Sequence, residues 1–276
     1  TTEIYTLSLH DALPISLFSA GSDVSLKYAP IAANNGCIVI DNSSAWRMDT
    51  EVPLVVPEVN PKDIKNNKGI IANPNCSTIQ LVVALKPIHD SFKLKRVIVS
   101  TYQSVSGAGQ KGIDQLMHEL EGRNYENKIS KHKISFNTIF HQIKDESGFS
   151  VEEIKMLNET KKIMGLKTLK MSVTCVRLPI LGGHGESVNI ETIKPFNKED
   201  LINVFKSSEN IQVIDNHQEE EYPTTQIASN TDKVYVGRIR IDQSVKNGAY
   251  LWVVSDNVRK GAATNAVQIA EELIKF

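Results

Sequence analysis

The sequence predicts an α/β protein that begins with a parallel βαβ unit and continues into a mainly antiparallel sheet. The order strand, helix, strand over residues 17–44 predicts the βαβ unit, because parallel neighbours need a helical crossover. Residues 95–105 mix polar and apolar side chains, as expected for a sheet with one solvated face. With 276 residues, the chain is long enough to bury the cores of two domains.

Composition narrows the class of protein further. The formal net charge is −1 and no dense block of Lys and Arg occurs, which argues against nucleic acid as the main partner. No apolar run approaches the roughly 20 residues of a membrane span. Three cysteines without a C-x-x-C pair or a secretory signal give no disulfide framework and no zinc site. We therefore expect a cytoplasmic protein without a metal.

The first elements form the βαβ unit. Residues 1–16 have neither helical nor strand periodicity and are assigned to no domain. Leu17 opens a strand that runs into a glycine turn at 19–22, an amphipathic helix follows, and Cys37–Ile40 is a buried strand. Polar loops at the carboxyl ends of parallel strands bind ligands in open α/β sheets, so 19–22 and 41–44 are candidate cofactor loops. Ordinary turns are the alternative.

Cys76 is the main candidate for chemistry. The apolar run Gly69–Ala72 predicts a strand, Asn-Pro-Asn at 73–75 forces a turn, and apolar residues at helical spacing follow. Cys76 therefore stands at a helix N-terminus, where unpaired N–H groups and the helix dipole favour the thiolate. A buried structural thiol is the alternative. Cys37 and Cys175 lie in β-branched, strand-like runs and are expected in the core.

A second glycine pattern follows the strand of 95–105. Gly107, Gly109 and Gly112 match the G-x-G-x-x-G of dinucleotide-binding loops. The pattern also requires an acidic residue about 20 positions on, at the end of a second apolar strand, and the sequence there is basic and polar. We therefore do not interpret this pattern as the phosphate loop of a βαβ unit.

The remaining elements follow from periodicity. After a short strand at 52–56, the expected strands are 169–180, 186–194, 211–215, 234–241 and 249–254. The expected helices are 78–89, 113–122, 151–164, 198–206 and 262–274. Residues 123–148 are polar and irregular, which is typical of a segment that covers a site or contacts another subunit.

His184 is the candidate acid or base. It lies in the glycine-rich turn 181–185, which we expect to be exposed, and Arg177 and Glu186 flank it in the sequence. A lone histidine in a turn is often incidental. A thiolate nucleophile, however, needs an acid or base nearby, and an arginine suits a carboxylate or phosphate substrate. Together with Cys76, these residues predict a catalytic site.

Four separated motifs add a family resemblance. They are Asn-Pro-Asn-Cys-Ser-Thr at 73–78, Tyr-Gln-Ser-Val-Ser-Gly-Ala-Gly at 102–109, Cys-Val-Arg-Leu-Pro with Gly-His-Gly-Glu-Ser-Val at 175–188, and Asp-Asn-Val-Arg-Lys-Gly-Ala-Ala at 256–263. In this order they resemble the aspartate-β-semialdehyde dehydrogenase family, from about Leu17 to the C-terminus. One departure stands beside the histidine, because Gly185 occupies a position where the family usually has Ser.

The resemblance implies two domains of the glyceraldehyde-phosphate dehydrogenase-like type. Residues 17–76 would form an incomplete Rossmann-like NADP-binding domain that the C-terminal helix of 256–276 rejoins, and residues 77–255 an α+β catalytic and dimerisation domain. The family's opening strand and glycine-rich diphosphate loop are not found, so weak NADP binding is expected of the chain as given. A truncated paralogue that serves only as an interaction or dimerisation module is the alternative function.

The resemblance also implies a reaction. It is the NADPH-dependent reductive dephosphorylation of L-aspartyl-4-phosphate to L-aspartate-4-semialdehyde and phosphate, a step toward diaminopimelate, lysine, threonine and methionine. Cys76 would form a thioester, His184 would act as acid and base, and Gln103 would orient the substrate. The implied assembly is a homodimer or homotetramer.

Binding residues are implied in the same way. The substrate-binding positions are Arg177 for the α-carboxylate, Glu159 or Glu186 for the amino group, and Arg47, Asn75 and Lys162 for the phosphate. The cofactor-binding positions are Ser19, Ala20, Gly21, Asn42, Ser43, Ser106, Gly107 and Asn257.

Overall fold

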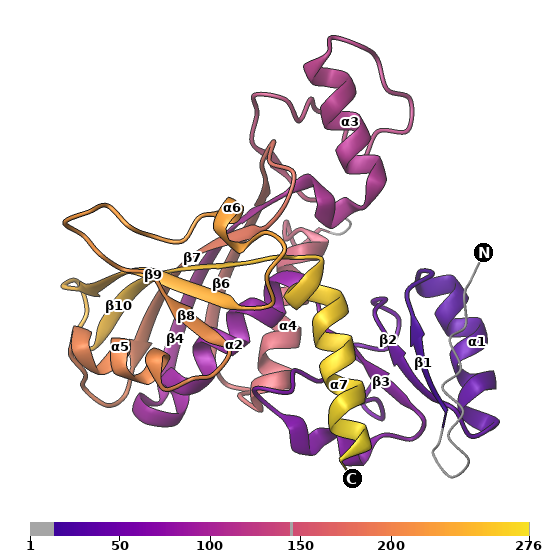
Figure 1. Ribbon diagram of the computed structural model, residues 1–276, viewed down its shortest axis with the longest axis horizontal. Coiled ribbons are helices and arrows are strands. Elements are labelled where there is room, and N and C mark those ends of the chain that lie inside the picture. Colours follow the sequence, from indigo (N-terminus) through magenta and orange to yellow (C-terminus); the bar gives the residue numbers. More distant parts are fainter. Residues whose placement is uncertain (1–13, 144–145, 276) are drawn as a thin grey trace.

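Two sheets organise the molecule. The computed structural model describes residues 14–143 and 146–275 (Figure 1). Within them, a three-stranded sheet has the order β1-β2-β3 and a seven-stranded sheet the order β5-β6-β4-β7-β10-β9-β8. The α/β class with two sheet regions is as predicted.

The three-stranded sheet contains the predicted βαβ unit. Strand β1 (Ile15–Phe18), helix α1 (Ser22–Asn34) and strand β2 (Ile38–Asp41) follow one another, and β1 and β2 are parallel. Strand β3 (Ile70–Ala72) extends the sheet in parallel beside β2. Strand β1 begins at Ile15, two residues before the predicted start, because Ile15 and Ser16 pair with β2 as well.

The strand predicted at 52–56 does not form. Leu54 makes only an isolated bridge to Ala72, although the segment is buried beside the edge of β3. Pro53 and Pro57 lack the N–H groups that a longer ladder would need. A short 3₁₀ helix, η1 (Pro61–Asn66), leads from this segment toward β3.

The seven-stranded sheet is mixed. Its strands are β4 (Leu94–Gln103), β5 (Ile139–Phe140), β6 (Lys170–Arg177), β7 (His184–Thr192), β8 (Ile211–Val213), β9 (Val234–Asp242) and β10 (Gly248–Ser255). Strand β4 is parallel to β6 and antiparallel to β7, and its side chains alternate in burial. The glycine pattern after β4 therefore belongs to this mixed sheet rather than to the βαβ unit.

Helices cover one face of the large sheet. Helix α2 (Cys76–Phe92) packs on β4, β7, β9 and β10, with α4 (Val151–Met164) and α5 (Lys198–Lys206) beside it. Ten residues of α2 are buried, since apolar side chains surround it on nearly all sides. A short helix, α6 (Thr225–Ala228), lies near β10. The large sheet and its helices therefore form the main core, and the first residue of α2 stands at its edge.

A small subdomain projects from this core at the top of Figure 1. A 3₁₀ turn, η2 (Val105–Ala108), connects β4 to helix α3 (Gln110–Leu120). Its separate core contains Val105, Leu116, Ile134 and Ile139.

The end of the chain returns to the βαβ unit. A π-helical turn, η3 (Arg259–Ala263), precedes α7 (Thr264–Ile274), which packs on β2 and η1. Lys260 in this turn is fully buried, and its ammonium donates to both carboxylate oxygens of Glu58, at 2.7 and 2.9 Å, and to Gln268 at 2.6 Å. This ion pair ties the C-terminal segment to the loop before η1.

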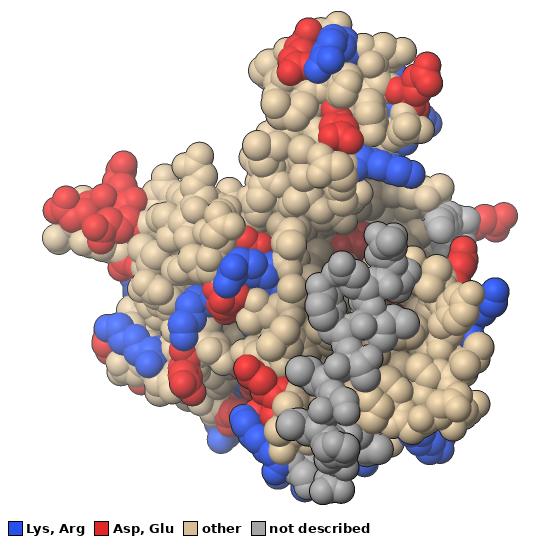
Figure 2. Space-filling view, turned by 45° about the vertical axis from the view of Figure 1, so that its right-hand side comes forward, with Lys and Arg blue, Asp and Glu red and all other residues tan. Residues whose placement is uncertain are grey.

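Two surface properties complete the description. Lys, Arg, Asp and Glu are scattered over the face seen in Figure 2, and Asp and Glu alone gather on the protruding end at the left. Among the residues that the structure describes, no helix combines the length and apolar character needed to cross a membrane.

Candidate active site

Cys76 is the first residue of α2, as predicted. The strand β3 ends just before it, and Asn75 caps the helix because its side-chain oxygen accepts from the N–H groups of Ser77 at 3.0 Å and Thr78 at 3.3 Å. Cys175 is buried, as predicted, but Cys37 is only half-buried and not in the core as expected, and Cys76 is half-buried as well. Gly261 of η3 approaches closely, since a Cβ there would lie 3.0 Å from the Cβ of Cys76. The nucleophile candidate therefore lies where the turn, α2 and η3 meet.

The predicted preference for the thiolate is wrong. Burial and the nearby carboxylate of Glu152 raise the pKa of the Cys76 thiol to about 12, although Arg47, the Ser77 N–H and Arg177 all lower it. The Ser77 N–H at the helix N-terminus lowers the pKa of the thiol as expected, but the loss of hydration on burial raises this pKa by more. The thiol is therefore protonated at neutral pH.

Glu152 is the residue that sequence reasoning missed. Its carboxylate accepts from the side-chain amides of Asn75 at 2.7 Å and Gln103 at 3.3 Å, and Lys155 lies 3.4 Å away. Burial alone would raise the pKa of Glu152, but Lys155, His141 and the two amides hold it at about 2. A signal existed, because Glu152 and the predicted Glu159 lie two helical turns apart and share a face of α4.

Gln103 lies at the predicted position beside the nucleophile's helix. Its amide donates to the hydroxyl groups of Ser77 at 3.0 Å and Thr101 at 3.2 Å, besides Glu152. Because all these partners are buried, the amide is fixed in orientation. Gln103 can therefore position a bound group next to Cys76.

Glu159 and Arg47 pair with each other. Arg47 Nη1 lies 3.3 Å from one carboxylate oxygen of Glu159, and the N–H of Asn75 donates to the other at 2.7 Å. Burial raises the pKa of Glu159, while Arg47 and that N–H oppose the change. Both oxygens are thus engaged in holding the turn before Cys76. Arg47 keeps one buried donor, Nε, without a partner.

Lys162 donates to backbone. Its ammonium reaches the carbonyl oxygens of Arg47 at 2.8 Å, Asp49 at 2.7 Å and Val52 at 2.9 Å. These three bonds use all three protons of the ammonium group. Lys162 therefore secures the loop of residues 47–52. Lys155, on the same helix, is partly exposed, and its hydrogen bond within residues 14–143 and 146–275 is to Glu152.

His184 is not in an exposed turn, contrary to the sequence prediction. It opens β7, where it pairs with Ser255 of β10, and it is fully buried. Strand pairing extends two residues further than the glycines suggested, because the pairing to β10 continues through Gly185. Burial and the charge of Arg177 lower the pKa of His184 to about 3, so its ring is neutral.

The orientation of His184 is fixed by Ser104. The Ser104 N–H donates to Nδ1 at 3.1 Å, and the Ser104 hydroxyl lies 3.1 Å from the same atom. Since a backbone N–H can only donate, Nδ1 accepts and the ring proton belongs on Nε2. The Nε2 atom is buried without a partner.

Arg177 and Gly107 lie next to that Nε2. Arg177 Nη1 donates to the Ser104 carbonyl at 2.6 Å. A Cβ added to Gly107 would lie 3.1 Å from His184 Nε2 and 3.4 Å from Arg177 Nη1. Because Gly107 has no side chain, the space beside His184 Nε2 and Arg177 Nη1 is left open. A ligand in this space could contact both of these predicted site residues.

Glu186 does not reach the site's surface. It is fully buried, and neither of its carboxyl oxygens makes a well-formed hydrogen bond with the described residues. Burial raises its pKa well above the ordinary value, with only the nearby Gln80 amide acting against it. Glu186 thus lies in the layer between β7 and α2, where burial favours the protonated form of its carboxyl.

The predicted nicotinamide contacts come together. Asn257 Oδ1 accepts from the hydroxyl groups of Ser104 and Ser106, both at 3.1 Å, and from the Gly183 N–H at 3.0 Å. Its amide donates to the Ser106 hydroxyl at 3.0 Å. Ser106 and Asn257 therefore lie on the same side of the site as His184.

The two predicted cofactor loops also lie side by side. Ser22 after Gly21 and Ser44 after Ser43 approach each other, with hydroxyl oxygens 3.2 Å apart. Gly21 has φ of +94°, which favours glycine, and it directly precedes α1. Ser43 donates to one oxygen of Asp41 at 2.6 Å, while the other is buried without a partner. Ser19, Ala20 and Asn42 belong to the same two loops.

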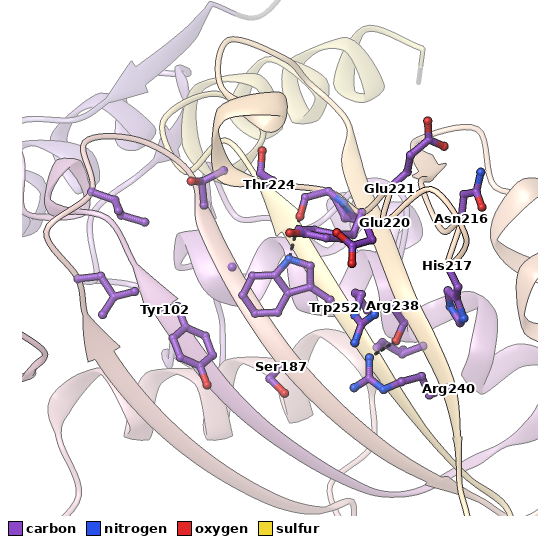
Figure 3. A pocket seen from close by; sticks show the side chains of 17 residues that line it. Tyr102, Ser187, Asn216, His217, Glu220, Glu221, Thr224, Arg238, Arg240 and Trp252 are labelled. Carbon is purple, nitrogen blue, oxygen red and sulfur yellow. Dashed lines mark hydrogen bonds between the residues drawn. The ribbon is translucent and has the colours of Figure 1, made fainter.

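A separate cavity of about 830 Å³ lies on the opposite face of the large sheet (Figure 3). Tyr102 and Trp252 line it with their rings 5.6 Å apart. Tyr102 neighbours Gln103 on β4, but strand side chains alternate between faces, so the cavity does not join the site. It does explain Gly185, because a Cβ there would lie 2.4 Å from ring atoms of Trp252.

Comparisons with known proteins agree with this geometry. The semialdehyde dehydrogenase dimerisation domain matches residues 85–260, and the semialdehyde dehydrogenase NAD-binding domain matches residues 3–67. The aspartate-semialdehyde dehydrogenase of Aquifex aeolicus is 54% identical over 272 residues, covering 95% of this chain and 80% of that protein. That of Bacillus subtilis is 48% identical, covering 96% and 81%.

Solved structures give the same answer. An aspartate-semialdehyde dehydrogenase II of Vibrio cholerae, complexed with ASA, superposes with a TM-score of 0.89 at 47% identity, covering 95% of this chain and 79% of that one. An enzyme of Candida albicans with NADP superposes with a TM-score of 0.73 at 26% identity, covering 94% and 77%. With its cysteine at the start of α2 and an oxidoreductase family matching along its length, the chain belongs to the aspartate-semialdehyde dehydrogenase family.

Proposed function

We propose that this chain catalyses the NADPH-dependent reductive dephosphorylation of L-aspartyl-4-phosphate to L-aspartate-4-semialdehyde, through a thioester on Cys76. The observation that carries the proposal is the position of Cys76 at the start of α2. Gln103 bonds to the adjacent Ser77, Arg177 acts on the Cys76 thiol, and Arg177 and His184 both lie beside Gly107. A sulfur displaces phosphate from an acyl phosphate without a metal, and the resulting thioester is electrophilic enough to be reduced. The product would feed lysine, threonine and methionine synthesis.

The substrate would be bound by charge. Arg177 presents a fork of donors for the α-carboxylate. Glu152, which is ionised and central, suits the ammonium group better than Glu159, whose two oxygens are engaged, or Glu186, which is buried and neutral. This assignment replaces both residues that the resemblance suggested.

The phosphate would lie near Arg47, whose buried Nε has no partner, and near Asn75. Lys155 suits this site better than Lys162, because the three carbonyl oxygens at Lys162 already occupy its ammonium. Both basic side chains would face an acyl phosphate held against Cys76. Their charges stabilise the leaving phosphate as its bond to carbon breaks.

Substrate binding would also activate the nucleophile. Glu152 raises the pKa of the Cys76 thiol, so an ammonium group bound to Glu152 would neutralise that contribution. Arg47 and Arg177 would then favour the thiolate with less opposition. The thiol would therefore become reactive when the correct amino acid is present, which limits side reactions of a free thiolate.

His184 would supply the proton for the reduced intermediate. Its Nε2–H points toward the space beside Gly107, where the oxygen on the carbon attached to Cys76 would lie. Because the ring is neutral, donation from Nε2 leaves an imidazolate unless Nδ1 gains a proton in the same step. Removal of such a general acid ordinarily costs about 10²–10⁴-fold in rate.

The described residues fit the nicotinamide end of the dinucleotide and the two loops of the βαβ unit, although the sequence shows no glycine-rich loop for its diphosphate. Asp41 has a buried, unpartnered oxygen between the two loops, and Gly107 leaves open a space that a Cβ would fill. Ser106, Gly107 and Asn257 would hold the nicotinamide end. Ser19, Ala20, Gly21, Asn42 and Ser43 would hold the rest. When bound, the reduced nicotinamide supplies the hydride.

The remaining assignments concern organisation. We place the nucleotide-binding domain at 17–76 with the helix of 256–276, and the catalytic and dimerisation domain at 77–255. Residues 15 and 16 join the first domain through β1, and the family's NAD-binding domain matches from residue 3. The match of a dimerisation domain to residues 85–260 supports a homodimer or homotetramer. Light scattering after size-exclusion chromatography would give the mass, and a monomer at micromolar concentration would overturn this assignment.

One assay tests the reaction. The purified chain is incubated with aspartate semialdehyde, phosphate and NADP, and NADPH formation is followed by absorbance. We expect activity in the parent and in Cys37→Ser, and a loss of at least about 10³-fold in Cys76→Ser. Trapping of a thioester on Cys76 by mass spectrometry would support the covalent step, and a Cys76→Ser variant with parental activity would rule it out.

A further inference from the structure

His184 is connected to the surface through two serine hydroxyls. The ring itself is fully buried, and so is Ser104, whose hydroxyl lies 3.1 Å from Nδ1. The Ser104 and Ser106 hydroxyl oxygens are 2.9 Å apart, and Ser106 is only half-buried. A continuous chain of hydrogen-bonding atoms therefore runs from Nδ1 outward.

Proton transfer along this chain requires one arrangement of protons, in which the Ser104 and Ser106 hydroxyls turn toward His184 and away from Asn257 Oδ1, which lies 3.1 Å from each of them. The amide of Asn257 donates to Ser106, the Ser106 hydroxyl donates to Ser104, and the Ser104 hydroxyl donates to Nδ1. Asn257 Oδ1 meanwhile accepts from the Gly183 N–H. In this arrangement the three hydroxyl or amide donors all point toward the histidine.

The proposed reaction requires a proton donor at Nδ1 of His184, and this chain of hydrogen bonds can provide one. A neutral imidazole that gives up its Nε2 proton becomes an imidazolate, which is a very poor product unless Nδ1 gains a proton in the same step. The backbone N–H of Ser104 cannot supply that proton, because an amide does not ionise near neutral pH. The Ser104 hydroxyl is the group that contacts Nδ1 and can exchange its proton.

We propose that Ser104 and Ser106 form a proton relay that recharges His184 during the reaction. The inference rests on the proposed function and deepens it. Nε2 loses its proton to the substrate oxyanion, forming an O–H bond, while the Ser104 proton moves to Nδ1. The Ser106 proton moves to Ser104, and a water molecule gives a proton to Ser106 and becomes hydroxide. Collapse to the aldehyde reverses these transfers, because Nε2 then accepts the O–H proton as the bond to the Cys76 sulfur breaks. Each transfer moves only a proton, so no oxidant or reductant is required.

Ser104→Ala tests the relay while leaving the backbone N–H in place. We expect kcat to fall about 10- to 100-fold, within the range of acid–base contributions, with KM within twofold of the parent. Ser172→Ala, an exposed serine on β6, is the matched control and should retain parental kcat. Ser104→Thr restores a hydroxyl and should recover most of the loss. Parental kcat in Ser104→Ala would overturn the relay.

A proton inventory separates a relay from a structural role. The parent's kcat in mixtures of H₂O and D₂O should curve, because several protons move together, and Ser104→Ala should give a straight line. A curved plot in Ser104→Ala would contradict the proposal.

Nitrogen NMR of His184 provides a readout that does not depend on turnover. Ring-proton exchange with water should slow at least about tenfold in Ser104→Ala, and equal exchange rates would refute the relay. If the parent itself lacks activity, the proposed function fails while this measurement still decides the relay.

Discussion

The Glu152 carboxylate raises the pKa of the Cys76 thiol, so the group best placed to bind an ammonium ion also restrains the nucleophile. Arg47 and Arg177 act in the opposite direction. The pKa of the thiol therefore depends on a balance of nearby charges, and a bound zwitterionic amino acid would change that balance. The first prediction tests this balance in the protein without substrate.

Glu152→Gln should make Cys76 more reactive. Removing the carboxylate lowers the pKa of the thiol, so the rate of iodoacetamide labelling at pH 8 should rise at least about threefold. In the parent, with a thiol pKa of about 12, the rate should rise tenfold per pH unit from 7 to 10. Labelling followed by peptide mass spectrometry measures both. Glu209→Gln is the exposed control, and a plateau near neutral pH in the parent would contradict the raised pKa.

Arg177→Lys should harm substrate binding far more than its retained charge suggests. A lysine offers a point charge where the guanidinium offers a fork, and it cannot keep both the Ser104 carbonyl and a carboxylate. We expect KM for aspartate semialdehyde to rise at least about tenfold, as the loss of one charge-assisted hydrogen bond would give. Steady-state kinetics measure this, with exposed Arg123→Lys as the control. A KM within twofold of the parent would remove Arg177 from the carboxylate site.

Lys155→Met and Lys162→Met should have different effects. The first should raise KM for phosphate at least about tenfold with little change in stability, because Lys155 is partly exposed. The second should lower the free energy of unfolding by about 1–3 kcal/mol, because three backbone carbonyl oxygens lose their donor. Phosphate titration in the assay and urea denaturation separate the two effects. The reverse pattern would return the phosphate role to Lys162.

Glu186→Gln should change how stability depends on pH. The pKa of Glu186 is raised in the folded protein, so between the ordinary value of 4.5 and that raised pKa the folded state holds a proton that the unfolded state has lost. The parent therefore loses stability from this group as pH rises through that interval, and the glutamine variant does not. In urea denaturation, the free energy of unfolding of the variant relative to that of the parent should increase as the pH rises from 5 to 8. The exposed control Glu271→Gln should show the same dependence of unfolding free energy on pH as the parent. The same dependence in Glu186→Gln would show that the pKa of Glu186 is not raised in the folded protein.

The sequence predicted what local patterns determine. The βαβ unit and the start of α2 at Cys76 follow from apolar spacing and one Asn-Pro-Asn turn, and both are confirmed. The strand at 52–56 fails because two prolines remove donors, although its residues are as apolar as a strand's. Local pattern alone does not reveal which neighbouring backbone is able to pair.

Electrostatic roles were harder to predict than positions. The burial of His184 depends on β10, and the charge around Cys76 depends on a helix that comes much later in the chain. The choice between Glu152 and Glu159 likewise depends on which of them already has an arginine and a backbone N–H as partners. Such partners come from distant segments, so spacing in the sequence does not identify them.

The π-helical turn at the end of the chain has a consequence for biosynthesis on the ribosome. Gly261 packs against Cys76, and Lys260 locks the turn to Glu58, so the nucleophile's surroundings are incomplete until almost the whole chain has been made. A nascent chain that has already formed the α2 helix would expose this cysteine without its final environment. Oxidative damage to Cys76 should therefore concentrate on newly synthesised or stalled chains, whereas finished molecules keep the sulfur protonated and half-buried.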